Sequence, residues 1–383
     1  MRVVHASKYY PPYNGGMETI LGDLCDGTAA GWDVQVVVAN DRPQTTREVR
    51  NGVSVTRAAA YGSAASVPLC PSLPWRLWTH AADCVVLHEP NPISGTALWL
   101  RTPAPRFVVW HHSDLLRPWW APATYGRIQR ALYRRADCVV VSSPALAADS
   151  ALVRHARRVS VIPFGVDVDR YRRTDPERTA RVESIRRRFP DGPLLLFVGR
   201  LVYYKGVHVL IEAARRWPGS IAIVGEGPLE SELRAEVVRR GLQDRVAFVG
   251  RVTDDDLPAY YQACDALVLP SIAKTEAFGV VQIEAMAAGR HVISTSLPTG
   301  VPWVNRDGVS GLVVAPGDAE ALGIALERIA KDAGLRALLA DGAKHRADSL
   351  FTRDRMVQSF KTLIETVVHE PERLADLDSS RVA

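Results

Sequence analysis

The sequence has few cysteines and no long hydrophobic run. Its five cysteines are scattered over 383 residues without a Cys-x-x-Cys pair. This pattern is typical of reduced, buried thiols in a cytosolic protein and argues against a disulfide framework or a metal site. No window reaches the ~18 uninterrupted apolar residues of a membrane-spanning helix. The first residues form the strand-like segment RVVHA at 2–6 without a basic-then-apolar signal segment, so we expect a cytoplasmic protein.

Positive charge is distributed unevenly along the chain. The formal net charge is +5, and residues 1–170 contain 18 Lys+Arg against 13 Asp+Glu. This leaves 29 of the 47 basic and 29 of the 42 acidic residues for the remainder, so the whole excess lies in the first half. The sequence lacks a recognised nucleic-acid-binding motif and any interleaving of aromatic and basic residues. The excess instead favours contact with an anionic lipid surface or a lipid diphosphate acceptor.

The chain is long enough for two domains and alternates strand and helix signals throughout. Its 47% hydrophobic and 23% charged content is typical of a globular protein and sufficient for two cores. Short apolar runs such as CVVLH at 84–88 are typical of parallel strands buried on both faces. The alternation predicts an α/β fold with two Rossmann-like, doubly wound parallel sheets. Strands are expected at 2–6, 33–39, 53–58, 84–88, 107–111, 138–142 and 159–163, and then at 194–198, 221–224, 245–249, 266–269, 291–294 and 311–314.

Helices are expected between these strands, and one charged segment marks the domain boundary. Residues 172–191 are highly charged and run into Phe-Pro-Asp-Gly-Pro, which predicts a helix followed by entry into the second domain. The first domain is therefore expected at 1–170 and the second at 171–351. Two stretches rich in Pro with Gly or Ser, 8–17 and 59–74, are expected to be loops. Further helices are expected at 18–30, 125–135, 144–154, 207–216, 228–240, 253–263, 279–288, 318–331, 334–350 and 352–368.

The stretch LVLPSIAKTEAFGVVQIEAMAAG at 267–289 organises the second half. A short buried strand is followed by a loop, and then by a helix that begins near Phe278 or Gly279. Glu276 lies in the loop and Glu284 lies more than one turn into the helix, so two carboxylates bracket the turn. Gly279 lets backbone N–H groups approach an anion at the positive end of the helix. A phosphate held there outlines a sugar-nucleotide site, while two glutamates at this spacing also fit a solvated helix face.

The pattern E-A-F-G-x-x-x-x-E in this stretch resembles the signature of the retaining GT-B glycosyltransferases, in particular glycosyltransferase family 4. The strand at 194–198 continues into GRLVYYKG, which resembles the diphosphate clamp of that family. Arg200 and Lys205 would neutralise a diphosphate leaving group beyond a strand end, where α/β sheets bind ligands. Seen alone, they also fit two solvated cations. By the resemblance, Glu276 positions the sugar hydroxyls and Glu284 binds the ribose.

Three further segments correspond to segments that the family places around its donor. GEGP at 225–228 would form a loop beside the donor, and the backbone around GRV at 250–252 would border the base. The two glycines at 15–16 would form a loop over the donor diphosphate. Each is also an ordinary turn when taken alone, and none is the GxGxxG fingerprint of an NAD enzyme. The residues expected to bind the nucleotide sugar are Gly15, Gly16, Gly199, Arg200, Lys205, Gly225, Glu226, Arg251, Val252, Glu276, Ala277, Phe278, Gly279, Val280 and Glu284.

The segment HHSD at 111–114 follows the strand FVVW. It resembles the His-x-Asp segment of mannosyl- and rhamnosyltransferase-like members of the family. The resemblance implies that His112 touches the transferred sugar or the acceptor, with His111 as the alternative because the histidine is doubled. It also implies that Asp114 orders the loop or an acceptor hydroxyl. The expected catalytic residues are His112, Asp114, Arg200, Lys205 and Glu276.

Two other features allow more than one interpretation. Asp254-Asp255-Asp256 contains Asp-x-Asp, a pattern that metal sites use, but Thr253 and Leu257 around it fit the first turn of a helix, where negative charge is favourable. An Arg/Lys clamp also makes a divalent ion unnecessary, as in the metal-independent enzymes that the sequence resembles, so we expect no metal and no other cofactor. The tryptophans near the His-x-Asp segment would stack on sugar rings or fill the core; they are Trp110, Trp119 and Trp120.

These resemblances imply transfer of a sugar from a nucleoside diphosphate donor with retention at the anomeric carbon. No second nucleophilic carboxylate is evident, which favours a mechanism in which the leaving phosphate takes the acceptor proton. YYKG, EAFGVVQ and HHSD look most like bacterial mannosyltransferases of exopolysaccharide and O-antigen (lipopolysaccharide) assembly. GDP-mannose is therefore the expected donor, and a UDP-hexose or GDP-rhamnose is the alternative.

The surroundings of the enzyme follow from the same resemblance and from the charge. The stretch 352–370 is similar to the terminal helix that crosses back onto the first domain in GT-B enzymes. An acceptor glycan on a polyprenyl diphosphate suits the basic first half, and would place the enzyme peripherally on the anionic inner face of the plasma membrane. Two rival classes remain, namely a GT-B sugar-nucleotide epimerase, which needs no acceptor, and a catalytically silent sugar-binding or scaffold protein.

Overall fold

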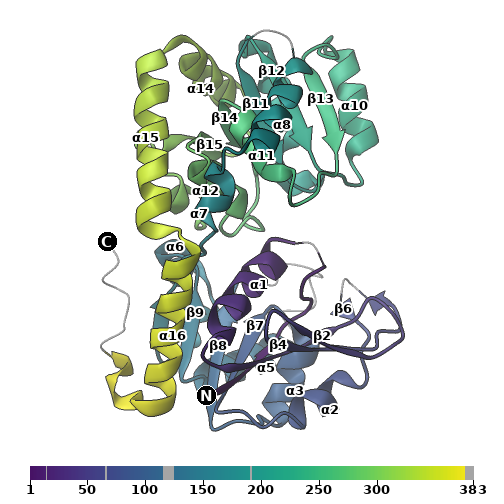
Figure 1. The fold of residues 1–383 in the computed structure, drawn as a ribbon, viewed down its shortest axis with the longest axis vertical. Coiled ribbons are helices and arrows are strands. Elements are labelled where there is room, and N and C mark those ends of the chain that lie inside the picture. The colour runs from purple at the N-terminus through teal and green to yellow at the C-terminus, as the bar shows by residue number, and fades with distance from the viewer. Residues whose placement is uncertain (14, 65–66, 115–124, 190–191, 376–383) are drawn as a thin grey trace. The chain divides into compact units, whose positions relative to one another are not determined.

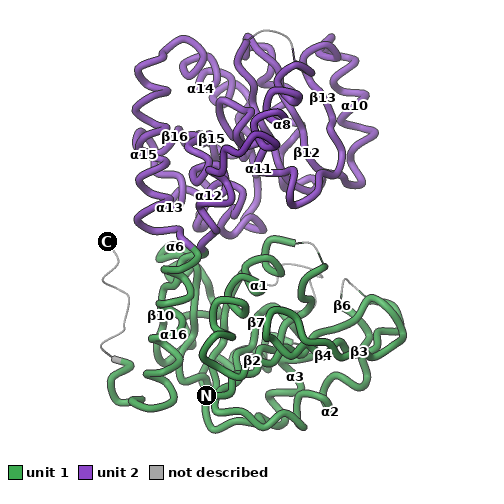
Figure 2. The backbone as a smooth tube through the Cα atoms, viewed as in Figure 1, with its two compact units in different colours: residues 1–164, 353–383 green, residues 165–352 purple. Residues whose placement is uncertain are grey.

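The chain folds into two compact units (Figures 1 and 2). The computed structural model describes residues 1–13, 15–64, 67–114, 125–189 and 192–375. Unit 1 comprises Met1–Phe164 and Arg353–Ala383, and unit 2 comprises Gly165–Thr352. Each unit contains one large sheet whose strands alternate with helices along the chain. The predicted fold class, two doubly wound parallel α/β sheets, is confirmed.

Unit 1 is built on an eight-stranded sheet in the order β10-β9-β8-β7-β1-β2-β4-β3. All neighbouring strands are parallel except β3, which runs antiparallel to β4. The strands are β1 (Arg2–Ala6), β2 (Asp33–Ala39), β3 (Thr46–Arg50), β4 (Val53–Ala58), β7 (Cys84–Glu89), β8 (Arg106–His111), β9 (Cys138–Val141) and β10 (Val159–Val161), and β5 (Ser63–Ala64) and β6 (Val67–Pro68) form a separate hairpin. The helices of this unit are α1 (Gly16–Ala29), α2 (Leu73–Trp78), α3 (Pro92–Leu100), α5 (Gly126–Arg135), α6 (Pro144–Asp149), η1 (Val153–His155), α16 (Arg353–His369) and η4 (Pro371–Ala375).

Unit 2 is built on a six-stranded parallel sheet in the order β13-β12-β11-β14-β15-β16. Its strands are β11 (Leu194–Val198), β12 (Ser220–Val224), β13 (Val246–Gly250), β14 (Ala266–Leu269), β15 (His291–Thr295) and β16 (Gly311–Val314). Its helices are α7 (Val168–Arg172), α8 (Pro176–Arg187), η2 (Tyr203–Lys205), α9 (Val207–Ala213), η3 (Ala214–Arg216), α10 (Glu230–Arg239), α11 (Leu257–Ala263), α12 (Val280–Ala287), α13 (Val301–Val304), α14 (Ala319–Lys331) and α15 (Ala333–Leu350).

The central strands are buried on both faces, as their continuous apolar sequences predict. Every residue of β7, β9, β12, β14 and β15 is buried. In unit 2 the core joins residues of β11 and β12 to apolar residues of α9, α10 and α14. Helix starts follow capping chemistry: the side chains of Asn91, Ser143 and Asp175 each accept a hydrogen bond from a backbone N–H of the helix that follows. A proline occupies the first helical turn in each case, where its missing N–H costs nothing.

Helix α16 packs within unit 1. It lies beside α1 (Figure 1), and the space where Gly27 would carry a Cβ is filled by the side chain of Val357. Phe360 of α16 is fully buried and contacts the rings of His5, Trp32 and Trp110. The end of the chain therefore completes the core of the unit in which the chain begins.

Several elements of unit 1 were not predicted. Strand β3 lies in a stretch to which no element was assigned, and four of its five residues are exposed, so it shows no apolar pattern. The Asn51-Gly52 turn that joins β3 to β4 has positive φ angles of 49° and 83°, which is the usual chemistry of a tight hairpin. The expected loop at 59–74 was wrong in part, because it contains β5, β6 and the start of α2. Helix α3 was missed because it is short and nearly uniformly apolar.

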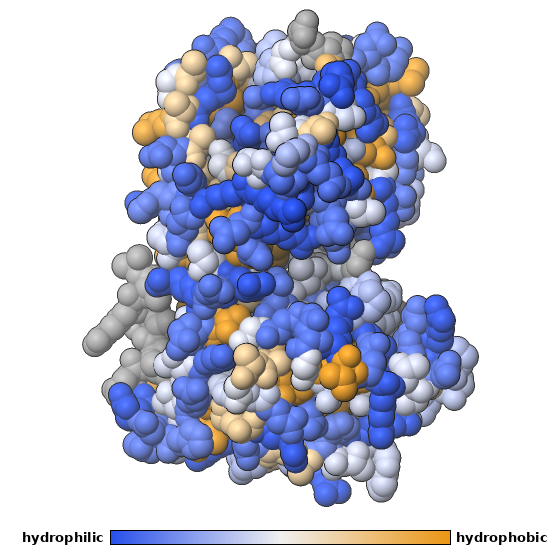
Figure 3. Space-filling view, viewed as in Figure 1, coloured by the Kyte–Doolittle hydropathy of each residue, from blue (hydrophilic) through white to orange (hydrophobic). Residues whose placement is uncertain are grey.

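The surface of the protein is mainly hydrophilic on the face shown in Figure 3, where apolar residues form small patches. No helix in the described part of the chain is long and apolar enough to span a bilayer.

Candidate active site

The centre of the site lies in unit 2 at the point where the strand order reverses. Strands β11 and β14 are neighbours in the middle of the sheet, and the chain proceeds from them toward opposite edges. The carboxyl ends of such a pair border the crevice in which open α/β sheets bind ligands. The loop after β11 contains Arg200 and Lys205, and the loop after β14 contains Glu276 and leads into α12. The topology therefore brings two predicted segments together that are about seventy residues apart in the sequence.

A close backbone contact joins these two loops. The N–H of Ile272 donates a hydrogen bond of 2.8 Å to the carbonyl of Tyr204. Gly206 has a φ of +68°, and a Cβ at this position would overlap the carbonyl oxygen of Pro270. Only glycine satisfies both the left-handed backbone and the close approach. Gly206 therefore allows the loop after β11 to lie directly against the loop after β14.

Lys205 and Glu276 form a nearly buried ion pair. The Nζ of Lys205 lies 2.6 Å from Oε2 of Glu276, and the two side chains are only 12% and 10% exposed. The hydroxyl of Ser271 donates a second hydrogen bond of 3.0 Å to the same oxygen. Burial lowers the pKa of Lys205, but the charges of Glu276 and Glu284 and the Tyr204 phenol raise it, so that the net pKa is raised. Lys205 therefore carries its positive charge throughout the neutral range.

Helix α12 points its N-terminus at the same loops. Gly279 caps the helix with a φ of +73°, and a Cβ here would lie 2.6 Å from Cδ2 of Leu269 at the end of β14. The adjoining residues are fixed on both sides, since the Gly300 N–H donates to the carbonyl of Ala277 and the ring of Phe278 contacts Trp303 and Phe351. The amides at the start of α12 and the dipole of the helix favour an anion at this place.

Glu284 lies inside the cluster and faces α11. Its Oε2 accepts a hydrogen bond of 2.5 Å from the hydroxyl of Tyr261. Burial raises the pKa of Glu284, and hydrogen bonds from Tyr261 and Tyr171 partly oppose this. Because the charge of Glu284 contributes to the pKa of Lys205, the two groups belong to one electrostatic site. A ribose hydroxyl would have to share this carboxylate with the two tyrosines.

Arg200 is the most accessible member of the cluster. Its side chain is exposed, whereas Lys205 is largely enclosed. The positive charges of Lys205 and Arg200 both oppose the burial that raises the pKa of Tyr204, which places Arg200 in the same electrostatic environment. The guanidinium of Arg200 forms no ion pair with any described residue and is available to an anionic ligand.

The loops after β11, β12 and β13 are joined edge to edge. The Gly225 N–H donates to the carbonyl of Gly250, and the Leu201 N–H donates to the carbonyl of Glu226. Gly199 and its neighbours thus lie beside the predicted loop GEGP, while Arg251 is exposed and Val252 is half-buried just beyond β13. The predicted nucleotide-binding residues of unit 2 all lie at or near the carboxyl end of its sheet.

In unit 1 the two histidines of the His-His-Ser-Asp segment point to different partners. The Nδ1 of His111 lies 2.6 Å from the hydroxyl of Tyr133 on α5, and its Nε2 lies 3.6 Å from Oδ1 of Asp114. Asp114 also accepts a hydrogen bond of 2.8 Å from Ser150. His112 packs instead against the rings of His88, Trp110 and Phe164. Trp110 is fully buried in the core, while Trp119 and Trp120 lie outside the described residues.

The two glycines at 15–16 lie at the N-terminus of α1. Gly15 is the residue before the helix and Gly16 is its first residue, so the expected loop at 8–17 ends two residues earlier than predicted. The carboxylate of Glu18 packs against Gly15 and occupies the space that a Cβ there would need. Burial raises the pKa of Glu18, and the charge of Lys8 partly offsets this shift.

Comparison with known proteins assigns the family. Residues 15–165 match the family described as glycosyl transferase 4-like domain, and residues 181–346 match glycosyl transferases group 1. The O-antigen chain mannosyltransferase C of Escherichia coli is 32% identical over 96% of this chain and 99% of its own. The D-rhamnosyltransferase WbpZ of Pseudomonas aeruginosa is 32% identical over 92% of each chain. The chain belongs to glycosyltransferase family 4. It is thus a retaining glycosyltransferase.

A solved structure agrees with this fold. The crystal structure of the Anabaena protein HepE in complex with UDP-glucose covers 96% of this glycosyltransferase and all of that chain, with a TM-score of 0.77 and 22% identity. The two doubly wound units of the glycosyltransferase are the GT-B fold.

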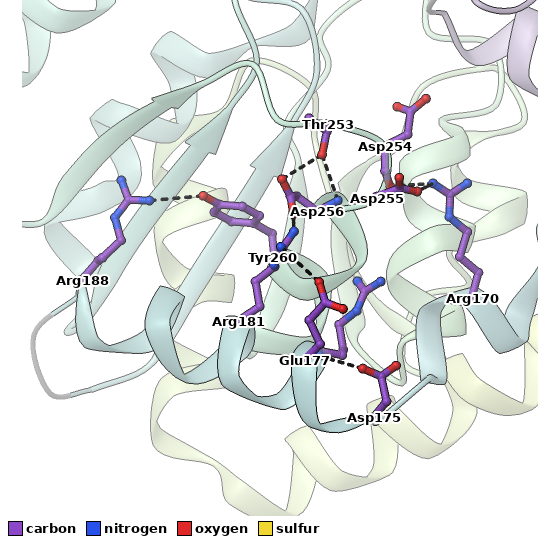
Figure 4. Close-up of polar contacts among 11 residues, drawn as sticks. Arg170, Asp175, Glu177, Arg181, Arg188, Thr253, Asp254, Asp255, Asp256 and Tyr260 are labelled. Atoms are coloured by element: carbon purple, nitrogen blue, oxygen red, sulfur yellow. Dashed lines mark hydrogen bonds and ion pairs between the residues drawn. The ribbon is translucent and has the colours of Figure 1, made fainter.

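Two of the three consecutive aspartates of the glycosyltransferase form ion pairs with arginines (Figure 4). Asp256 pairs with Arg181 of α8, and Asp255 lies 3.9 Å from Arg170. The hydroxyl of Thr253 donates a hydrogen bond of 2.8 Å to Asp256. The acids were predicted to lie in the first turn of a helix. They lie instead in the turn that precedes α11. Among the described residues no three His, Cys, Asp or Glu side chains gather in a way that would hold a metal ion.

Several residues of the site were not identified from the sequence. Ser271 donates a hydrogen bond to Glu276, and Tyr261 donates one to Glu284. Tyr204 raises the pKa of Lys205. Ser271 follows directly after a buried strand, a position that could have marked it. Gly206 is part of the GRLVYYKG motif, but its packing against Pro270 depends on β14 lying beside β11. The order of strands in the sheet leaves no local signal in the sequence.

Proposed function

We propose that the enzyme transfers a hexose, mannose from GDP-mannose, to a glycan or polyprenyl-diphosphate-linked oligosaccharide in bacterial polysaccharide synthesis. The observation that supports a nucleoside diphosphate sugar as the donor is the enclosed Lys205–Glu276 pair beside the N-terminus of α12, at the switch point of the unit 2 sheet. The names of the two relatives support bacterial surface polysaccharide as the setting and mannose or rhamnose as the sugar.

In this proposal some residues of the cluster stabilise charge and others position the donor. Lys205, Arg200 and the amides of α12 stabilise the diphosphate as it leaves, because positive charge in a largely enclosed site acts strongly on developing negative charge. Glu276 holds the ammonium of Lys205 through Oε2, and its Oε1, which takes part in neither of these hydrogen bonds, accepts from the sugar hydroxyls. Glu284 binds the ribose. The departing phosphate oxygen takes the acceptor proton on the same face of the sugar.

A thermal-shift panel identifies the donor base. GDP and GDP-mannose should raise the melting temperature more than UDP, ADP and their sugars, because a ligand that binds only the native state stabilises it by about 2.7 kcal/mol at one hundred times its Kd. GDP should also stabilise more than GMP, and this difference should shrink in Lys205→Ala, which lacks the diphosphate contact. Stabilisation by UDP without stabilisation by GDP would reassign the donor to a UDP-hexose. Rhamnose transfer from GDP-rhamnose would keep the base and change the sugar.

An epimerase would use the same fold and a similar donor pocket without an acceptor. Incubation with the nucleotide sugar alone, followed by NMR, separates the two activities, because only an epimerase converts the donor when no acceptor is present. A catalytically silent binding protein would leave the donor unchanged with and without acceptor.

An arginine face of unit 1 supports peripheral contact with the inner face of the plasma membrane. Arg127, Arg130 and Arg134 share one side of α5, and Arg154 of η1 adjoins them. The pKa of His155 is lowered by burial and by the charges of Arg134, Arg130 and Arg154, which shows how closely these cations gather. Among the described residues none of the four arginines forms an ion pair. An uncompensated cluster of this kind attracts an anionic lipid surface.

Charge reversal on this face should release the enzyme from anionic vesicles. At about 1 kcal/mol per cation near the surface, loss of the two positive charges in Arg127→Glu/Arg134→Glu should by itself weaken binding to phosphatidylglycerol vesicles roughly thirtyfold at low salt, and the two added carboxylates should weaken it further. Arg187→Glu/Arg239→Glu, which makes the same charge change on exposed arginines of unit 2, is the matched control. Equal binding by both double variants, or no binding by the wild type at low salt, would remove the assignment of this face.

A further inference from the structure

Three buried histidines of unit 1 form a continuous hydrogen-bonded chain. They come from three adjacent strands, with His5 on β1, His88 on β7 and His112 directly after β8. The Nδ1 of His5 lies 3.0 Å from Nε2 of His88, and the Nδ1 of His88 lies 3.0 Å from Nε2 of His112. Their exposed fractions are 0%, 5% and 6%. Three adjacent strands, two of them more than eighty residues apart in the sequence, therefore place three imidazoles in one row.

Aromatic packing holds the rings of the chain in place. The rings of His88 and His112 stack at 5.3 Å, and the indole of Trp110 lies nearly parallel to His112 at 6.0 Å. Phe360 packs on His5 at 5.6 Å, and Phe164 packs on His112 at 5.7 Å. These contacts restrict rotation of the imidazoles, so the nitrogens that face one another cannot easily exchange.

Burial keeps all three imidazoles neutral. It lowers the pKa of His5 and of His112 to about 3, and it also lowers the pKa of His88. A neutral imidazole has one N–H donor and one acceptor nitrogen. His88 lies in the middle, so it must donate through one nitrogen and accept through the other. The chain therefore has a direction, and only two arrangements of its protons satisfy both hydrogen bonds.

The two arrangements differ in which end is left with an unpaired N–H. The Nε2 of His5 and the Nδ1 of His112 are both buried without a hydrogen-bond partner among the described residues. In one arrangement the unpaired N–H is on His5, which is fully buried beside Phe360. In the other it is on His112, at the end of β8 in the predicted His-x-Asp segment. A buried donor that stays unpaired is destabilising, and a ligand oxygen at His112 removes that cost.

We propose that His88, and His5 behind it, are positioning residues that hold His112 with its proton on Nδ1, so that this N–H donates to a hydroxyl oxygen of the transferred sugar or the acceptor. The identity of the ligand rests on the proposed glycosyl transfer; the direction of the chain does not. In this arrangement all three rings carry their proton on Nδ1. His112 acts as a fixed hydrogen-bond donor and takes no proton from the acceptor, which agrees with proton transfer to the leaving phosphate.

The direction of the chain is read from the full-length wild-type protein by NMR. Selective ¹⁵N labelling of histidine and long-range ¹⁵N–¹H correlation distinguish Nδ1–H from Nε2–H rings, and single substitutions of His5, His88 and His112 assign the signals. We expect three neutral rings, each with its proton on Nδ1. A proton on Nε2 of His112, or exchange between both nitrogens, would overturn the proposal. This measurement needs no substrate, so it stands even if the proposed activity fails.

A matched pair of variants tests the role in transfer. The amide of His88→Asn takes the place of Nδ1 and still reaches His112, whereas the amide of His88→Gln takes the place of Nε2 and reaches only His5. Each variant loses one hydrogen bond, so the two should have similar melting temperatures. Glycosyl transfer by His88→Gln should fall roughly tenfold to a hundredfold below that of His88→Asn, as is usual when a supporting hydrogen bond is lost. Equal activities in the two variants would exclude the positioning role, while an inactive wild type with the expected NMR spectrum would exclude only the proposed function.

Discussion

Replacement of Lys205 by alanine is expected to lower the turnover of glycosyl transfer by roughly 10²–10³-fold, the effect of losing one preorganised donor to a developing negative charge. The Lys205 side chain is 12% exposed and lies beside the N-terminus of α12, so in the variant little water can take the place of the ammonium when the diphosphate leaves. Rates measured at saturating donor separate this effect from weaker donor binding. A wild-type rate in the variant would remove Lys205 from the diphosphate clamp.

Stability must be measured beside activity in this variant. Removal of Lys205 leaves Glu276 buried without its counter-charge, and breaking such a pair typically costs 3–5 kcal/mol, less where some solvent reaches it. The double variant Lys205→Ala/Glu276→Gln also lacks the negative charge of Glu276. It should therefore regain stability without regaining turnover. Lys331→Ala, at an exposed position of α14, is the control for loss of a lysine far from the site in the sequence. If turnover recovers together with stability, Lys205 has only a structural role.

The same pair gives a pH dependence with a defined sign. The folded pKa of Lys205 is raised above the ordinary value of 10.5. The stabilisation that this shift reports is fully present below the ordinary pKa and is lost as the pH rises through the folded value. Lys205 therefore does not lose its proton near neutral pH. Any change of the transfer rate with pH in the neutral range must come from another group.

The parts of the fold that followed from the sequence are those with continuous burial. Runs such as CVVL in β7 and IAIV in β12 are continuously apolar because both faces of a central parallel strand are covered. Strand β3 shows the opposite case: TREVR is exposed at the edge of the sheet and pairs only with β4. Its hairpin turn, Asn51-Gly52, was the available signal. Helix α3 likewise had Asn91 and Pro92 as a start signal, but too few turns to display a period.

The site was predictable as a set of motifs and not as a set of contacts. Lys205 and Glu276 each follow a buried strand, and that position alone marks candidates for ligand binding. Their distance of 2.6 Å depends on β11 and β14 being neighbours, which no local pattern reveals. The same limit applies in unit 1, where His88 reaches His112 only because β7 and β8 pair in register. His111 and His112 have different partners because adjacent residues at the end of a strand point to opposite faces, and contact of His112 with the sugar stays a prediction.

Gly206 is expected to tolerate no side chain. Alanine here would adopt a left-handed backbone at φ +68° and would also overlap the carbonyl of Pro270. Left-handed backbone alone costs about 1–2 kcal/mol for a non-glycine residue. The overlap is with backbone, which cannot rotate away, so we expect a total loss of about 3–5 kcal/mol, in the range of severe core substitutions.

Gly241→Ala is the matched control for this substitution. Gly241 has nearly the same φ, +66°, but a Cβ there would meet no atom within 4 Å. It should therefore lose only the cost of the backbone conformation, and the difference between the two variants in urea denaturation measures the overlap with Pro270. Because the contact at Gly206 presses the Lys205 loop against the loop of Glu276, Gly206→Ala should also reduce transfer while Gly241→Ala should not. Equal destabilisation by both substitutions would show that the two loops can separate without cost, and the Lys205–Glu276 pair would then not depend on this contact.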